Sequence, residues 1–204
     1  MTKFHFPTFH EMFPVEKRKL KLLREWLRYR VRCLVFATQC RALVDFIHEN
    51  PLWQPVFVQY PYRVNTLLSQ YCDKHFNATQ RLDAIKTNFA IAEKHFGVAL
   101  CETLISQQPV LLAQLTDELA LNLTLNHIDP YEGFFAIALT DANQRTIYSA
   151  SFTFLTDNRL LIASIQGPKG DEAQDLVRQA TKLLHRPLRS EEHTSKLQSL
   201  MRIS

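Results

Sequence analysis

The spacing of apolar residues changes from a helical period to strict alternation at Leu119, and this change most constrains the fold. Upstream, residues 15–49 contain neither glycine nor proline, and their leucines recur near a helical period. Downstream, leucine occupies every second position of residues 119–125, with Asn122 and Asn126 predicted on the opposite, solvent-facing side. Helices followed by a run of strands predict an α+β domain.

Three local signals locate the helices of the first half. Asn77 is followed three residues later by Gln80, which predicts a capping box at a helix start. Gly97 is a natural end for that helix, and Pro109 suits the first position of another. The prolines between residues 50 and 63 end the first helix. The predicted helices cover residues 15–49, 78–96, 98–107 and 109–116.

The second half is predicted to be an antiparallel meander. Short turns at residues 141–144 and 156–159 require neighbouring strands to run in opposite directions. A glycine-containing turn after the last strand then leads into an amphipathic helix, for which Asp171 is the expected N-cap. The predicted strands are residues 119–127, 133–139, 145–154 and 160–165.

The turn between the last strand and the last helix is a candidate anion-binding site. A helix N-terminus presents unpaired N–H groups, and glycines allow a phosphate to approach the backbone. The residues concerned are Gln166, Gly167, Lys169, Gly170 and Asp171. They match no established phosphate-loop pattern. An ordinary turn followed by a helix cap explains the same residues, so both interpretations stay open.

Composition indicates one domain with an aromatic core and no bound metal or cofactor. The 204 residues include fourteen Phe, and the four Cys form no C-x-x-C pair. We interpret the cysteines as small buried groups, with Cys33 and Cys40 on one helix face. His127, Asp129 and Glu132 are close in sequence, but Pro130 argues against a shared strand face and a metal site.

The chain begins with a basic segment that suggests a membrane partner. Eight basic residues lie between Lys17 and Arg32, against Glu16 and Glu25, with Trp26 interleaved. An anionic lipid surface is one partner for such a helix, and the solvated outer face of a first helix is the alternative. No groove-reading motif accompanies the segment, so nucleic acid is not expected. Without a signal peptide or transmembrane run, the predicted location is the cytoplasm, peripheral to the inner membrane.

Four stretches, YEGFFAIAL, IYSASFTF, LLIASIQGPKG and LVRQATKLLH, resemble in order and spacing the VirK/YbjX family of bacterial proteins. The resemblance runs from about Pro51 to Leu188. It departs at Phe134, at Ala163–Ser164 in place of paired glycines, and after His185. The matching motif residues are Glu132, Gly133, Tyr148, Phe152, Gln166, Gly167, Thr181, Lys182 and His185.

The resemblance implies a role in virulence, in cell-surface assembly or in tolerance of membrane-active peptides, with no established biochemical activity. The strand–turn–helix order also resembles acyl-CoA N-acetyltransferases, which makes an acyl-CoA-dependent transferase the alternative function. The spacing after Gln166 departs from the pyrophosphate loop of those enzymes, and no carboxylate lies on the last strand.

The expected organisation has three parts: a basic helical region (residues 1–60), an α+β family core (61–188) and a tail (189–204). The tail resembles translated sequencing adapter, so we interpret it as non-native. The family core is then incomplete at its C-terminus, and residues 160–165 are expected to leave an open apolar sheet edge.

Overall fold

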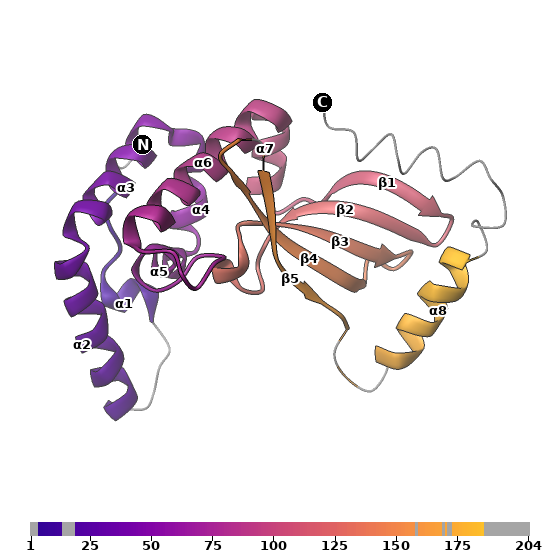
Figure 1. Ribbon diagram of the computed structural model, residues 1–204. Coiled ribbons are helices and arrows are strands. Elements are labelled where there is room, and N and C mark those ends of the chain that lie inside the picture. Colours follow the sequence, from indigo (N-terminus) through magenta and orange to yellow (C-terminus); the bar gives the residue numbers. More distant parts are fainter. Residues whose placement is uncertain (1–3, 14–18, 158, 169, 171–172, 186–204) are drawn as a thin grey trace.

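The computed structural model describes residues 4–13, 19–157, 159–168, 170 and 173–185 of the 204-residue chain. Helices occupy the first half, a five-stranded antiparallel sheet follows, and one helix comes after the sheet (Figure 1). The α+β fold predicted from the sequence is confirmed. Residues 189–204, the predicted tail, lie outside the described residues.

The first helices are α1 (Phe9–Met12), α2 (Lys19–Val35) and α3 (Ala37–Glu49). The sequence predicted a single helix up to Glu49, but the structure divides it at Phe36, whose ψ of 26° departs from the helical value. Cys33 and Cys40 therefore lie on different helices, so the prediction of one shared helix face was wrong.

Short helical turns carry the chain from α3 to the long helix α6 (Ala78–Phe96). The predicted capping box is confirmed: the Gln80 amide donates to Asn77 Oδ1 at 3.0 Å, and the Asn77 amide donates to Gln80 Oε1 at 2.9 Å. Gly97, with φ of 75°, ends α6 and leads into α7 (Val98–Ile105). The intervening turns are η1 (Pro51–Trp53), α4 (Gln54–Val58), η2 (Pro61–Val64) and α5 (Asn65–Leu68).

The helix predicted at residues 109–116 is instead the strand β1 (Val110–Thr116). Its apolar run is too short for periodicity to separate a helix from a strand. The next strand, β2 (Leu119–Leu125), begins after only two residues, and pairing with it satisfies the β1 backbone. Val110 lies opposite Leu123, and Thr116 lies opposite Leu119.

The remaining strands form the predicted meander, in the order β1-β2-β3-β4-β5 with every neighbouring pair antiparallel. Leu125 pairs with Phe135, and Phe135 in turn pairs with Phe152. Residues 160–165 belong to the edge strand β5, as predicted. The strands are β3 (Phe135–Asp141), β4 (Thr146–Leu155) and β5 (Arg159–Gln166), and η3 (Pro130–Glu132) precedes β3.

The core between the helices and the sheet is aromatic, as the composition predicted. Phe89 of α6 lies 4.6 Å from Trp53 and 5.0 Å from Phe134, measured between ring centroids. Phe57 and Phe135 complete the cluster, and all five side chains are buried. Large rings contribute much apolar area to folding, so this cluster holds the helical half against the sheet.

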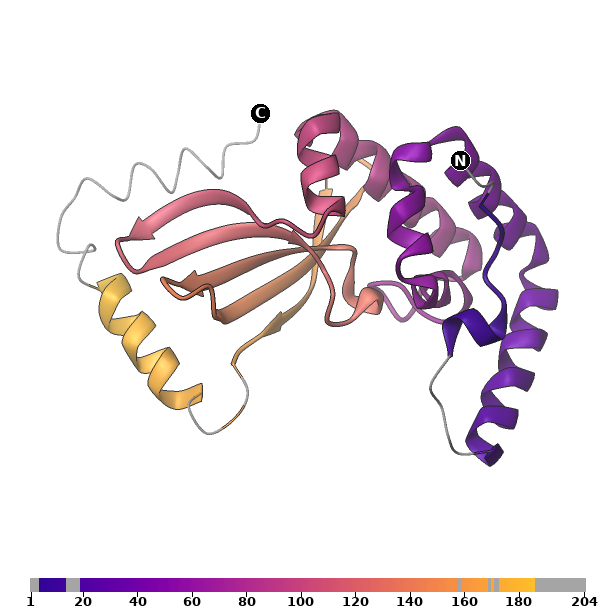
Figure 2. The same cartoon turned by 180° about the vertical axis from the view of Figure 1, so that it is seen from behind.

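A second, smaller core lies under α8 (Ala173–His185). Ala180 is buried against Leu119, Leu139 and Ile147. Figures 1 and 2 show α8 at the end of the sheet away from the helical half. The two ends of the sheet are therefore covered by different elements.

The prediction that Asn122 and Asn126 face solvent was wrong, because both are buried. The Asn122 amide donates to Thr140 Oγ1 at 2.8 Å, which satisfies it inside the sheet. The Asn126 amide donates to Asp129 O at 2.7 Å and to Gly133 O at 2.9 Å. Asn126 therefore fixes the shape of the loop between β2 and β3.

Candidate functional site

The predicted glycine corner joins β5 to α8, as the sequence indicated. Gly170 adopts a φ of 98°, which favours glycine, and α8 begins at Ala173. A Cβ atom on Gly167 would lie 3.3 Å from the Tyr148 ring, so glycine fits closely there. Lys169 and Asp171 lie outside the described residues, and anion binding at this corner stays a prediction.

Glu132 and Gln166, two of the family-motif residues, meet in a hydrogen-bonded cluster. Gln166 Nε2 donates to Glu132 Oε2 at 2.7 Å, and Ser164 Oγ donates to the same oxygen at 2.6 Å. The cluster ties η3 to β5 and engages the side chain of Gln166. Ser164 departs from the family pattern, yet it is a hydrogen-bond partner of the motif carboxylate.

Two other motif pairs are close packing contacts. Gly133 has a φ of 117°, and a Cβ atom there would lie 2.4 Å from the carbonyl oxygen of Phe152. Only glycine fits such a position without moving the backbone. Gly167 and Tyr148 form the second pair, as described above. Tyr148 and Phe152 lie on β4, and each of the two glycines lets the chain pass close to one of them.

The motif residues of α8 do not join this cluster. Thr181 Oγ1 donates to Val177 O at 2.8 Å within its own helix, and Lys182 is exposed. The His185 side chain lies outside the described residues. Because α8 packs on β1 and β4 through the second core, Thr181 and Lys182 share no site with Glu132.

Asp129 lies in the loop after β2, as Pro130 suggested. His127 lies in the same loop, because β2 ends at Leu125 and not at residue 127 as predicted. Asp129 Oδ1 accepts from the Tyr131 amide at 2.9 Å and caps η3. Glu132 is engaged by Ser164 and Gln166 instead. Within the described ranges, no group of three or more His, Cys, Asp or Glu side chains is arranged to hold a metal ion.

Helix α2 presents an apolar stripe to solvent. Leu20, Leu27 and Leu34 recur every seven residues and are 85%, 57% and 75% exposed. This periodicity places them on one helix face. The same face carries Leu23 and Val31, and Val35 and Trp26 are exposed beside it. The apolar residues that predicted α2 are thus mostly outside the core, where an apolar stripe normally faces inward.

Basic side chains flank this stripe. Helix α2 contains six basic residues and one acidic residue, Glu25. Arg24 and Arg28 both lie near the Glu25 carboxylate, at 3.3 and 3.0 Å, and Arg30 lies over the Trp26 ring at 5.9 Å. One carboxylate cannot neutralise this many cations, so the outward surface of α2 is positively charged as well as apolar.

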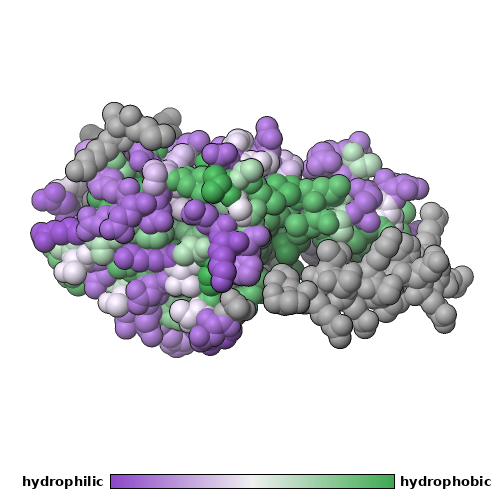
Figure 3. Space-filling model, turned by 90° about the horizontal axis from the view of Figure 1, so that it is seen from above, coloured by the Kyte–Doolittle hydropathy of each residue, from purple (hydrophilic) through white to green (hydrophobic). Residues whose placement is uncertain are grey.

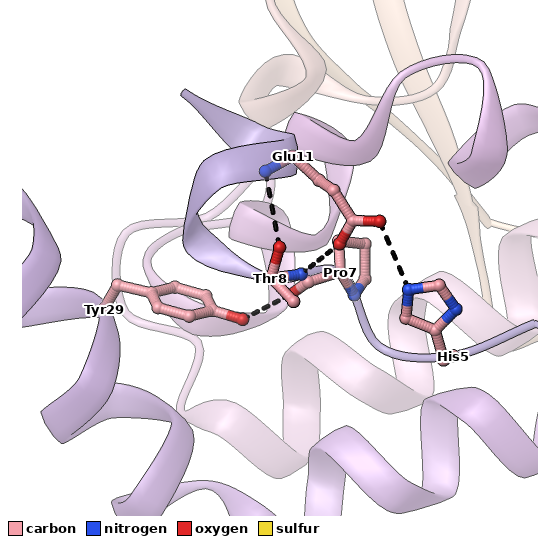
Figure 4. A network of polar contacts seen from close by, with 5 residues as sticks. All are labelled: His5, Pro7, Thr8, Glu11 and Tyr29. Atoms are coloured by element: carbon pink, nitrogen blue, oxygen red, sulfur yellow. Dashed lines mark hydrogen bonds and ion pairs between the residues drawn. The ribbon is translucent and has the colours of Figure 1, made fainter. Parts of the chain in front are cut away.

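The opposite face of α2 is held by the N-terminal segment (Figure 4). The Tyr29 hydroxyl donates to the Pro7 carbonyl oxygen. Thr8 and Glu11 form a capping box on α1, in which the Thr8 amide donates to Glu11 Oε2 at 2.6 Å. His5 Nε2 lies 3.2 Å from Glu11 Oε1. The hydrogen bond of Tyr29 therefore joins this face of α2 to the N-terminal segment, and the other contacts hold that segment together.

A cavity of about 500 Å³ lies between this N-terminal segment and helices α2 and α3, and Cys33 and Cys40 both line it. A hydrogen bond from the Cys40 thiol lowers the pKa of Cys33 to about 7, with a smaller contribution from the charge of Arg30. Cys33 is only half-buried. The interpretation of all four cysteines as small buried groups is therefore wrong for Cys33, and also for Cys72, which is half-buried; Cys40 and Cys101 are buried.

The fold and this surface define a class: an α+β protein whose helical half carries an outward-facing, cationic and leucine-rich helix. The chain belongs to the VirK/YbjX family. A family model described as a protein of unknown function (DUF535) matches residues 18–190. The match includes α2 and so begins well before Pro51, where the resemblance seen in the sequence motifs began.

Relatives with this similarity are found in other bacteria. An uncharacterised protein of Haemophilus influenzae is 50% identical over 184 residues, which cover 89% of this chain and 63% of the relative. A protein named membrane protein LapB, of Mannheimia haemolytica, is 27% identical over 183 residues, or 89% of this chain and 79% of the relative.

A second uncharacterised Haemophilus influenzae protein is 26% identical over 188 residues, which cover 62% of that relative. The chain therefore spans less than two thirds of the length of both Haemophilus relatives. No solved structure matches the chain. None of the helices that the structure describes has the length and apolar character of a transmembrane span.

Proposed function

We propose that the protein is a peripheral membrane protein that binds anionic lipid through α2. The observation that carries the proposal is the exposed stripe of Leu20, Leu23, Leu27, Val31 and Leu34 beside basic residues. An amphipathic helix of this kind lies in the plane of the interface, with its apolar face among the acyl chains and its cations near the phosphates.

Charge complementarity favours a lipid surface over a second copy of this chain. A self-association through this stripe would place Arg24, Arg28 and Arg30 of two copies near one another, and like charges oppose that contact. A bilayer containing anionic lipid attracts the same residues. The name of the Mannheimia relative, membrane protein LapB, agrees with a membrane location.

The proposed biological role follows the family. Bound at the cytoplasmic face of the inner membrane, the protein would assist cell-surface assembly, and thereby virulence or tolerance of membrane-active peptides. This role rests on the family resemblance, and α2 supplies only its membrane contact.

Vesicle flotation tests the proposal. We expect the protein to float with vesicles of phosphatidylglycerol and phosphatidylcholine at low salt, and to float less as salt rises. The Leu23→Gln/Leu27→Gln variant should lose most of the binding, because removing two exposed leucines weakens the free energy of membrane binding by about 2–3 kcal/mol. Val98→Gln/Leu111→Gln is the matched control, because it alters two apolar side chains of similar exposure away from α2.

Equal flotation of the two double variants would contradict the proposal. A loss of binding in Leu23→Gln/Leu27→Gln that accompanies a change from dimer to monomer in sedimentation would indicate self-association as the role of the stripe. The proposal therefore requires that the wild-type protein be monomeric in solution at the concentration used for flotation.

An acyl-CoA-dependent transferase is the second candidate, and the order of strand β5, a glycine-containing connection and helix α8 favours it. Gly170 has a positive φ, and the backbone there is open to a ligand, since a Cβ atom would meet nothing within 4 Å. Calorimetry with coenzyme A tests this candidate. The absence of any heat of binding at about 1 mM ligand would exclude it.

A further inference from the structure

A cavity of about 320 Å³ lies where the helical half meets the sheet. Tyr60, Tyr62 and Arg63 line it from the helical side, and the loop from Asn126 to Tyr131 lines it from the sheet side. Figures 1 and 2 show η3, at the end of this loop, beside α5. Small-molecule sites of this size are common where two parts of a fold meet.

Arg63 is buried beside this cavity without a carboxylate partner. Its side chain is only 3% exposed, and among the described residues no carboxylate oxygen lies within 4 Å of its guanidinium. Nη1 donates to Val56 O at 3.3 Å and Nη2 donates to Asn126 O at 2.9 Å. These bonds use two of five N–H donors and leave the positive charge uncompensated.

A buried cation is costly unless an anion pairs with it. Burial lowers the pKa of Arg63 to about 10, which still leaves the guanidinium protonated at neutral pH. Its carbon Cζ lies 4.8 Å from the centre of the Tyr60 ring, so the guanidinium sits between two lining residues, Tyr60 and Asn126. The charge is therefore held at the cavity wall by the fold.

We infer that this cavity binds a small oxyanion, a carboxylate or a phosphate, through Arg63, with a ring or other flat apolar group of the ligand against the tyrosines. The Tyr62 and Tyr131 rings lie 6.0 Å apart, and their hydroxyl oxygens are 2.9 Å apart. Tyr60 packs against the His127 ring at 5.6 Å. Guanidinium groups pair well with such oxyanions, and aromatic walls suit a flat ligand.

The surrounding charges favour an anion on balance. A neighbouring cavity shares Tyr62 and Tyr131, and Arg28 and Arg32 of α2 line it. Two carboxylates oppose them: Asp129, which lies in the cavity wall and caps η3, and Glu25, which lines the neighbouring cavity 3.0 Å from Arg28. Since Asp129 repels an anion while Arg63 attracts it, substitutions of the two residues should change affinity in opposite directions.

Calorimetry or NMR titration with benzoate and phenyl phosphate tests this inference, with benzamide and benzylamine as neutral and cationic probes of the same shape. We expect the two anions to bind and the other two probes to fail. Arg63→Gln should weaken anion binding at least about tenfold, the usual loss for a charged hydrogen-bond partner. Arg81→Gln is the matched control, because Arg81 is also buried and donates to the carbonyl oxygens of Leu67 and Phe76, and it does not line the cavity.

A variant that binds the anion more tightly distinguishes an effect on ligand binding from an effect on folding. Asp129→Asn keeps an oxygen for the Tyr131 amide but removes the charge, so anion affinity should rise about threefold or more. His127 supplies a second signal, since partial desolvation and the charge of Arg63 lower its pKa. A bound anion should raise the pKa of His127 in an NMR titration.

Three results would overturn the inference: equal binding of benzoate and benzylamine, unchanged affinity in Asp129→Asn, or a His127 pKa that does not respond to the anion. Flotation of Arg63→Gln identifies the source of the oxyanion. Unchanged vesicle binding indicates a soluble ligand, and reduced binding indicates a lipid headgroup in the cavity. Loss of vesicle binding in the α2 variants with intact benzoate binding would show that the two sites are separate.

Discussion

At the scale of single residues, the structure gives physical reasons for several family-motif positions. Gly133 is required by the close approach of the Phe152 carbonyl, and Glu132 accepts hydrogen bonds from Ser164 and Gln166. The sequence motifs identified Glu132 and Gln166 as a set, but spacing alone could not reveal that they contact each other across 34 residues.

Gly133→Ala should destabilise the protein strongly. The added Cβ atom would lie 2.4 Å from the Phe152 carbonyl oxygen, and the φ of 117° disfavours any side chain. We expect a loss of about 3 kcal/mol or more in the free energy of unfolding, measured by urea denaturation. Gly97→Ala is the control: its φ of 75° and ψ of 162° also disfavour a side chain, but nothing lies near its Cβ, so a smaller loss of about 1–2 kcal/mol is expected. Equal losses would show that the contact with Phe152 is unimportant.

Cys33 should be the most reactive thiol among the four cysteines. The Cys40 thiol lowers the pKa of Cys33 to about 7, whereas burial raises the pKa of Cys72 to about 12 and that of Cys101 to about 11. In the native protein at pH 7, iodoacetamide should modify Cys33 at least about tenfold faster than Cys101, as followed by mass spectrometry of peptides. The Cys40→Ala variant should slow this modification. Similar modification rates for Cys33 and Cys101 would contradict the lowered pKa of Cys33.

Arg63 shows which signal in the sequence was overlooked. It is the only charged residue between Glu49 and Asp73, in a segment rich in proline and aromatic residues. A single arginine in such a segment can be buried, and its carbonyl partners then come from elsewhere in the chain. The partner Asn126 is 63 residues away, which no local pattern could have predicted.

At the scale of secondary-structure elements, the sequence predicted best where a local signal sets the boundary. The capping box at Asn77 and the ending of α6 at Gly97 are local and were predicted correctly. Strand β1 was predicted as a helix, because its identity depends on pairing with β2. Helix α2 was predicted as a helix, but the sequence could not decide which of its faces lies inward.

The N-terminal segment that fixes α2 should loosen at acidic pH. The pKa of Glu11 is lowered mainly by a hydrogen bond from the Thr8 backbone and, to a smaller extent, by a hydrogen bond with the Thr8 side chain. The unfolded chain has a glutamate pKa of about 4.3, and the folded protein has a lower one. The ionised carboxylate therefore stabilises the fold above about pH 4.3. This stabilisation is lost as the pH falls through the folded-state pKa. Amide protection factors of Thr8 and Glu11, measured by NMR, should therefore fall below about pH 4.3. Glu11→Gln should remove this pH dependence, and a wild-type profile that stays flat would contradict the role of Glu11.

At the scale of the whole molecule, apolar surface is exposed in separate places. Figure 3 shows hydrophobic residues gathered over α7 and the start of the sheet, where Val98, Leu111 and Leu112 are exposed. On β5, which pairs with β4 alone among the described strands, Leu160, Ile162 and Ile165 are also exposed. The open apolar edge expected from the sequence is present in the described part of the chain.

Basic charge distinguishes the α2 stripe from these other apolar surfaces. β5 carries only Arg159 as a charged residue, and α7 carries only Glu102, whereas α2 carries six basic residues. Under the proposed function, an anionic bilayer would select α2 among the apolar surfaces of the molecule. This selection is the central claim about function.

The fluorescence of Trp26 tests this claim most directly. Trp26 lies on α2 and is 40% exposed, whereas Trp53 is fully buried and serves as an internal reference. If α2 lies in the lipid interface, vesicles containing phosphatidylglycerol should shift the emission to shorter wavelength, and brominated acyl chains should quench it. The Trp26→Phe variant should lose both responses. An emission spectrum that does not change on addition of these vesicles at low salt would contradict the claim.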